Sequence, residues 1–504
     1  MKGNLLAKSV STLSGDIHSF KRQFSRIQGK YAFKFALSIM LFLGAAHISL
    51  GSNPVVPILA ILTMALAMWP MARYGVMNIA AILILLVAFR YVGFPLFAKL
   101  AMGQALDTHL DQPVAAYAAV MFGVVAYLGA FFLTNKVNIG KPLLKPLTEP
   151  HKLRRLSYAA YVVGFAANLA TSLRGFVVSD DVTISNFFTP FLHLALIAAA
   201  AASLMRSGSR RVVDSWVLII LVTEVIFAFA LNARTPIMEA FICLVLTATV
   251  FHGRFNKTLI AWGLAALLLL TAITPIILSA RGSRADLTLY ERVAVTAEAV
   301  KNWEQAKAAY VDSLVDESLS SGYFMRYYDM PNTVFERLSH VNDVDVLITG
   351  ADTHHTLGFE VIDQAIIRSL PRFLAPDKPR DYSEGDWIYC EFGVKCLYGN
   401  YLTASLLGVG YAAFGWVGVM AFPFLLGLPL FFLIKKAVGF NLVGNIWAVF
   451  LLVSINNQFV EGGASAYIAM FLRDVPQDLV VLFALASLVG ASRIALRKSN
   501  ESYP

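Results

Sequence analysis

The chain has 504 residues, of which 58% are hydrophobic and only 14% are charged, and its mean hydropathy is +0.65. This composition excludes an ordinary water-soluble globular protein, because soluble chains carry more charge and show amphipathic periodicity. The formal net charge is +9, but the basic residues stand in short clusters between apolar runs. That distribution is typical of membrane topology signals and not of a nucleic-acid-binding surface, so no nucleic acid is expected as a partner.

Apolar runs of membrane-spanning length follow one another along the chain. The expected spans cover about 31–50, 54–72, 74–98, 113–134, 156–174, 188–205, 213–232, 235–252, 258–279, 414–434, 441–459 and 476–493. They predict an all-α, polytopic integral membrane protein with about 12 transmembrane helices. The segment 401–434 is too long for one simple span. We therefore expect an interfacial or re-entrant helix over Tyr401–Tyr411, followed by a true span after Gly415.

The basic clusters predict on which side of the membrane each connection lies. The first thirty residues are polar and basic, and no convincing cleavage site follows, so the first span is expected to stay attached. With the N-terminus inside, the inner segments collect most of the basic residues, including six between Lys136 and Arg155. By the positive-inside rule both termini lie in the cytoplasm. The resulting layout is a tail (1–30), nine spans (31–280), a large outer loop (281–400), the interfacial helix with three spans (401–493), and a tail (494–504).

The expected loop 281–400 is the one long stretch that cannot lie in a bilayer, since it holds 12 basic and 19 acidic residues. A guanidinium donates hydrogen bonds in a fork that suits phosphate oxygens, so arginines converging at the outer boundary would suit a lipid-linked diphosphate. A single such arginine more often snorkels or binds a lipid headgroup. The candidates at outer span ends and in the loop are Arg234, Arg281, Arg284, Arg337, Arg368 and Arg372.

The loop also holds His340, His354 and His355, with several aspartates nearby in sequence. A neutral histidine can act as general base towards a sugar hydroxyl, and a carboxylate can orient its ring. Adjacent histidines do not reproduce a known ligand spacing, so no metal site is expected. Cys390 and Cys396 are close enough for a small disulfide loop on an oxidising side, and two free thiols are the equal alternative.

Short motifs in this loop resemble a known family. They are Arg337-Leu338-Ser339-His340, Gly358-Phe359-Glu360 and Leu370-Pro371-Arg372-Phe373-Leu374-Ala375-Pro376-Asp377-Lys378-Pro379, with Arg234-Thr235-Pro236 and Phe414-Gly415-Trp416-Val417-Gly418 beside spans. Together they resemble the pattern of bacterial oligosaccharide repeat-unit polymerases, the Wzy-type O-antigen and exopolysaccharide polymerases. That family often has Trp where this chain has Ala375. The motifs cover about a third of the chain.

The resemblance implies an inverting glycosyltransferase without metal or other cofactor, acting at the periplasmic face of the bacterial inner membrane. The donor would be a glycan on undecaprenyl diphosphate, and the acceptor a new lipid-linked repeat unit. Membrane lipid and a chain-length regulator protein are further candidate partners. Arg281, Arg284 and Arg372 would bind the diphosphate first, with Arg234, Arg337 and Lys378 next. His340 is the favoured base, ahead of His354 and His355.

Other functions remain open. An O-antigen ligase shares the topology and the donor but transfers to lipid A core. A glycosyltransferase using a lipid-monophosphate sugar usually has acidic residues in the first outer loop, and the segment 47–53 has none. A transporter or flippase is expected to show repeated halves and broken helices, and the sequence indicates neither. Within the spans, Arg90, Glu224 and Glu239 either line a pathway or pair inside the bundle.

Overall fold

The computed structural model describes residues 29–173, 188–231, 235–252, 327–329, 338–370, 383–393 and 404–490, with isolated positions between 291 and 335 and at 375. Across these ranges the regular structure is helical and no strand is present, apart from one isolated antiparallel bridge between Asn78 and Asn441. The prediction of an all-α protein is therefore confirmed for this part of the chain. The expected span 258–279 and both tails lie outside it.

Five helices among the described residues are long and apolar enough to cross a membrane. They are Gly29–Ser49, Val55–Tyr74 (α2), Ile79–Ala101 (α3, η1 and α4 in succession), Pro113–Lys136 (α5) and Leu406–Ala437 (α18). Four shorter apolar helices are Phe191–Arg206 (α8), Ser215–Ala228 within α9, Pro236–Phe251 within α10, and Ile446–Glu461 (α19). These helices indicate a protein embedded in a membrane. The number of about 12 spans stays a prediction.

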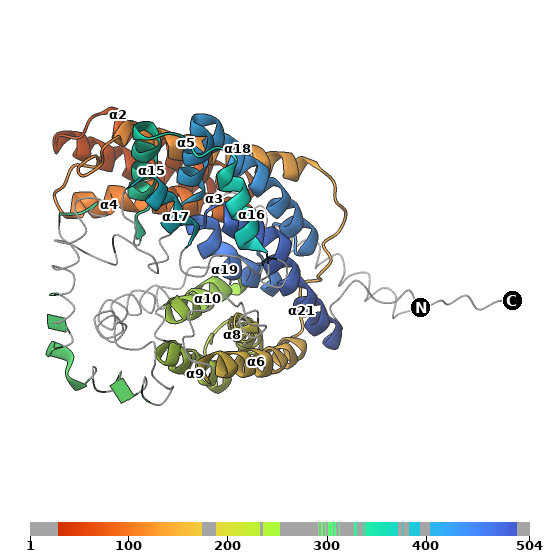
Figure 1. Ribbon diagram of the computed structural model, residues 1–504. Helices are drawn as coiled ribbons and strands as arrows, with labels where there is room; N and C mark the ends of the chain where they lie inside the picture. Colours follow the sequence, from red (N-terminus) through yellow and green to blue (C-terminus); the bar gives the residue numbers. More distant parts are fainter. Residues whose placement is uncertain are drawn as a thin grey trace.

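The helices form two groups that meet at α19 (Figure 1). The first group contains α2, α3 (Ile79–Ala88), α5 and α18, and the second contains α6 (Pro150–Leu173), α8, α9 (Ser215–Leu231) and α10 (Thr235–His252). Helix α19 packs against α3 of the first group and against α8 and α10 of the second. Every residue of 446–453 is buried, as is every residue of 191–204 in α8. Helices that are apolar on all sides are expected at the centre of such a bundle.

Polar side chains cap the starts of three of these helices. The side-chain oxygens of Asn78, Ser405 and Asn445 accept hydrogen bonds from backbone N–H groups in the first turns of α3, α18 and α19. The first N–H groups of a helix have no partner within it, and water cannot supply one in an apolar environment. The caps therefore fix where these helices begin.

Helix α18 is broken at Phe414 and Gly415, where the backbone leaves helical geometry. Gly415 has φ 59° and ψ −141°, a conformation that only glycine adopts without strain. Beyond the break, the two halves lie against each other, since a Cβ on Gly418 would lie 1.8 Å from the carbonyl oxygen of Gly410. The expected break at Gly415 is thus confirmed. The preceding helix starts at Leu406, and every residue from 406 to 413 is buried inside the protein. Its expected interfacial or re-entrant position stays a prediction.

Two further helices are interrupted by single π-helical turns. The first, η1 (Phe89–Gly93), separates α3 from α4 (Phe94–Ala101), and the second, η3 (Met470–Asp474), separates α20 (Ala464–Ala469) from α21 (Val475–Leu488). Neither turn was expected from the sequence, and the helix that contains the first of them, Ile79–Ala101, is still a single candidate span. A π-helical turn accommodates one extra residue and has no simple sequence signature, but such turns often mark functional positions.

Three helices of the expected outer loop pack directly on the bundle. They are α15 (Val341–Thr353) on α5 and α18, α16 (Glu360–Ser369) on α20, and α17 (Glu384–Glu391) on α16 and α18. The carboxylate of Asp345 accepts hydrogen bonds from the backbone N–H groups of Asp111 and Gln112, each at 2.8 Å. Burial raises the pKa of Asp345 to about 6. Gly350 lies within α15, and a Cβ at this position would meet the ring of Phe392.

We predict that Gly418→Ala destabilises the protein by about 3 kcal/mol, because overpacking at the contact with Gly410 forces the two halves of α18 apart. The matched control is Gly129→Ala in α5, where a Cβ would make only ordinary contact with Phe424. That variant should be neutral or slightly stabilising, since alanine favours helix. Thermal unfolding of the purified proteins measures both effects, and an unchanged Tm for Gly418→Ala would contradict the close packing.

Candidate functional site

The residues expected to bind the diphosphate lie outside the described part of the chain. They are Arg234, Arg281, Arg284, Arg337, Arg372 and Lys378. The expected bases His340, His354 and His355 are all described. Cys390 is disulfide-bonded, and its expected partner Cys396 lies outside the described residues.

His340 lies in a network of charged side chains where α15 meets the membrane helices. Its Nδ1 lies 3.0 Å from Oδ2 of Asp343, in the first turn of α15. Its Nε2 lies 2.6 Å from Nη2 of Arg90, in η1. Nη1 of the same arginine lies 2.6 Å from Oε1 of Glu461, the last residue of α19. The network therefore joins a loop helix to two membrane helices.

Backbone and aromatic contacts hold this network in place. The backbone N–H of His340 donates to the carbonyl oxygen of Arg90 at 3.3 Å, and the imidazole packs on the ring of Tyr91 with 5.4 Å between ring centroids. The hydroxyl of Tyr91 donates to the carbonyl oxygen of Val460 at 2.9 Å. The side chain of His340 is only 7% exposed, whereas that of Glu461 is 31% exposed. The network is therefore open to solvent on its Glu461 side.

The geometry determines where the His340 proton lies. Because arginine can only donate, Nε2 must accept from Arg90, and Nδ1 carries the proton that it donates to Asp343. Burial lowers the pKa of His340, but the nearby carboxylates of Asp343 and Glu461 outweigh that effect and raise the pKa overall. The contact with Arg90 favours the neutral ring, because it occupies the Nε2 lone pair and the positive charge of Arg90 lowers the pKa of His340. A histidine oriented by a carboxylate is the usual arrangement of a general base.

The other two histidines lie at the opposite end of α15. Both are exposed, and the ring of His354 stacks on Phe392 with 6.4 Å between centroids. Because α15 has 13 residues, its ends are about 20 Å apart. The structure therefore does not bring His354 or His355 together with His340. Over the described ranges, no three His, Cys, Asp or Glu side chains are arranged to hold a metal ion.

A second group of ionisable side chains is buried among α8, α9, α10 and α19. Nε2 of His193 lies 3.5 Å from Oε1 of Glu224 and 3.7 Å from Oε2 of Glu239. The amide of Asn457 donates to Oε1 of Glu239 at 2.9 Å. The two glutamates that the sequence places in spans therefore face each other across the bundle. Asn457 precedes Glu461 by one helical turn, so this group lies next to the His340 network along α19.

Glu461, His193 and Asn457 were not among the functional residues expected from the sequence. A signal was present, because the segment Asn456-Asn457-Gln458-Phe459-Val460-Glu461 is polar at the end of an otherwise apolar span. Ionisable or amide side chains inside a membrane helix are functional candidates by default. For Arg90, the structure supplies the partner that the sequence left open.

A comparison of this chain with protein-family models, curated proteins and solved structures finds no match. Residue geometry and the motif resemblance are therefore the only grounds for a function.

We predict that Arg90→Gln destabilises the protein by about 2 kcal/mol, because it removes the closest ion-pair partner of the Glu461 carboxylate. The double variant Arg90→Gln/Glu461→Gln should lose less stability than the single one, since no uncompensated charge remains. Chemical denaturation of the purified variants in one detergent gives the double-mutant cycle. Equal stability of wild type and Arg90→Gln would show that this ion pair contributes nothing.

Proposed function

We propose that this chain joins undecaprenyl-diphosphate-linked oligosaccharide repeat units at the periplasmic face of the bacterial inner membrane. The reaction would be an inverting, metal-independent glycosyl transfer that yields O-antigen or exopolysaccharide. The observation that carries the proposal is the pair His340–Asp343 beside Arg90, at the junction between the loop helices and the membrane helices. His340 also ends the first of the loop motifs that resemble the polymerase family.

In this reaction an acceptor hydroxyl oxygen bonds to the anomeric carbon of the donor glycan. The bond from that carbon to the diphosphate oxygen breaks, and undecaprenyl diphosphate leaves with the electron pair. The hydroxyl proton passes to Nε2 of His340, and Asp343 stabilises the imidazolium that forms. The arginines expected at the outer boundary would stabilise the charge that develops on the diphosphate.

Arg90 links donor binding to the availability of the base in this proposal. Its guanidinium contacts Nε2 of His340 and Glu461 together, and Glu461 is the open side of the network. A diphosphate approaching from that side offers Arg90 a stronger, doubly charged partner. When Arg90 turns to the diphosphate, Nε2 is free to accept the proton. The base would then act only after the donor is bound.

Two observations support an outward-facing loop. Cys390, near the end of the loop, is disulfide-bonded, and disulfides persist in oxidising compartments such as the periplasm. The distribution of basic residues independently favours cytoplasmic termini and an outer loop. Both agree with a site that uses lipid-linked substrates after they have crossed the membrane.

We predict that His340→Gln lowers the rate of polymer formation by at least about 100-fold, because the hydroxyl loses its proton acceptor. The matched controls are His354→Gln and His355→Gln, which should retain activity because both side chains are exposed at the far end of α15. Purified protein incubated with lipid-linked repeat units, followed by gel analysis of product length, measures this. Normal polymer from His340→Gln would remove the residue from the reaction.

We also predict that Asp343→Asn moves the acidic limb of the pH–rate profile to lower pH. Asp343 raises the pKa of His340, so removing its charge lowers that pKa, and the base remains unprotonated at lower pH. The maximal rate should fall as well, because the ring loses its orienting carboxylate. Asp363→Asn, at an exposed position in α16, is the control and should leave the profile unchanged. An unshifted acidic limb in Asp343→Asn would contradict the assignment.

An O-antigen ligase would use the same donor and the same chemistry with a different acceptor. A deletion strain separates the two functions. Loss of a polymerase leaves lipid A core capped with a single repeat unit, whereas loss of a ligase leaves no cap at all.

A transporter or flippase is the second candidate function, and two features of the described residues favour it. One is the buried group of His193, Glu224 and Glu239 within the membrane helices, and the other is the interruption of three helices. Ionisable groups and broken helices are features of transport pathways. Substrate accumulation in proteoliposomes, without formation of a glycosidic bond, would favour this function over the polymerase.

A further inference from the structure

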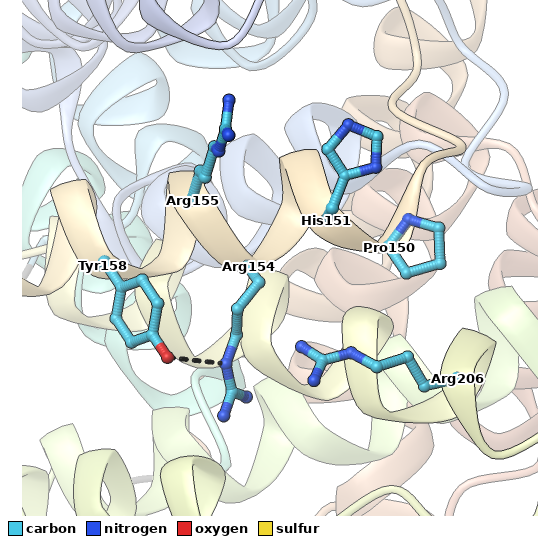
Figure 2. Close-up of a pocket in the computed structure, with 6 residues that line it drawn as sticks. All are labelled: Pro150, His151, Arg154, Arg155, Tyr158 and Arg206. Atoms are coloured by element: carbon cyan, nitrogen blue, oxygen red, sulfur yellow. Dashed lines mark hydrogen bonds between the residues drawn. The ribbon is translucent and has the colours of Figure 1, made fainter.

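The membrane helices carry a basic hollow far in sequence from the His340 network. It has a volume of about 510 Å³ and is lined by Pro150, His151, Arg154, Arg155, Tyr158 and Arg206. Figure 2 shows the Arg206 side chain extending from α8 towards Arg154 on α6. The lining thus brings three guanidinium groups and an imidazole together from two helices, and it includes no acidic residue.

One arginine of the hollow is held rigidly. Nη1 of Arg154 lies 2.9 Å from Oδ2 of Asp214, and its Nε donates to the hydroxyl of Tyr158 at 3.2 Å (Figure 2 shows the latter bond). Its guanidinium also lies over the rings of Tyr158 and Trp216. An arginine fixed in this way loses little side-chain entropy when a ligand arrives. Arg154 therefore forms a preorganised wall of the hollow.

The other two arginines are available for a ligand. Both side chains are exposed, and within the part of the chain that the structure describes neither Arg155 nor Arg206 makes an ion pair. The nearby acid Glu149 pairs with Lys152 at 2.5 Å and with His151 at 3.4 Å. The hollow therefore keeps an excess of positive charge, and its ligand should be an anion.

An exposed apolar stripe leads away from the hollow along α6. Tyr158, Val162, Phe165 and Leu169 recur at spacings of four, three and four residues, so they share one face of the helix. All four are exposed, and Val162 is 66% exposed. On a membrane helix such a face contacts acyl chains. A ligand with an anionic headgroup and apolar chains would therefore contact both the basic hollow and the apolar stripe. A soluble anion would contact only the hollow.

We propose that this hollow binds the phosphate of an anionic phospholipid headgroup, with the acyl chains lying along the exposed face of α6. Arg155 and Arg206 contact the phosphate oxygens. Arg154, which is held by Asp214 and Tyr158, forms the rigid part of the lining. The basic clusters predict that this end of α6 faces the cytoplasm, opposite the proposed reaction. The lipid site does not depend on the glycosyl-transfer proposal, because it rests on other residues and another chemistry.

The test uses full-length protein in detergent and measures phosphatidylglycerol binding against phosphatidylcholine by native mass spectrometry. Wild type should prefer phosphatidylglycerol, and Arg155→Gln or Arg206→Gln should each weaken its binding about fivefold, the effect of one basic side chain near an anionic lipid. The double variant Arg155→Gln/Arg206→Gln should weaken binding about thirtyfold. The matched control Arg210→Gln/Arg211→Gln removes the same charge from the α8–α9 connection, outside the hollow, and should bind like wild type.

Four results would count against the proposal. One is an equal loss in the control variant, since surface charge alone would then explain the preference. Another is equal binding of phosphatidylglycerol and phosphatidylcholine by the wild-type protein, which would rule out a headgroup site regardless of the results for the variants. The third concerns the source of the phosphate: glycerol 3-phosphate or inorganic phosphate that competes as well as the lipid would show a site for a soluble anion. Retained binding in the single variants would remove those arginines from the site even if the double variant failed to insert.

Discussion

The ion pair between Arg90 and Glu461 is the interaction on which the candidate site depends. Each residue lies at the end or interruption of an apolar helix, where a charge without a partner is costly. Together they fix η1 against the end of α19, and the remaining donors of Arg90 then hold the ring of His340. The carboxylate of Asp345 fixes α15 to the start of α5 independently, but without the Arg90–Glu461 pair the imidazole and the carboxylates of the network would not share one position.

Helix α19 connects this site to the rest of the bundle. Its apolar first half is buried between the two helix groups, and its polar last turn presents Asn457 and Glu461 to two separate groups of ionisable side chains. The same helix thus packs between the two helix groups at one end and carries polar and ionisable side chains at the other. Because the two groups are one turn apart, a change of charge in one alters the electrostatic environment of the other.

Two clusters of charged side chains in the described structure differ in their balance of charge. The His340 network contains one arginine and two carboxylates, and the hollow on α6 and α8 is lined by arginine without acid. The first arrangement is nearly neutral and suits proton transfer, whereas the second suits a bound anion. In the functions proposed above, the first cluster would take part in the reaction and the second would bind a membrane lipid.

Glycines determine the shape of the segment that leads from the loop into α18. Gly415 supplies a backbone conformation closed to other residues, and Gly410 and Gly418 let two backbones touch. The break was predictable, because the segment is too long for one span and glycines stand in its middle. The contact between its halves was not, because a glycine in sequence does not show which backbone approaches it.

The sequence by itself determined that this is an all-α membrane protein, where most of the described helices lie, and that His340 has an aspartate within a helical turn. These follow from local properties, namely hydropathy, run length and residue spacing. The tertiary structure decided that Arg90 and Glu461 meet, although 371 positions separate them, that His354 and His355 stay apart from His340, and that Arg206 joins the arginines of α6. Those pairings depend on how helices pack across the bundle, and apolar helices of similar length carry no pattern that specifies their neighbours.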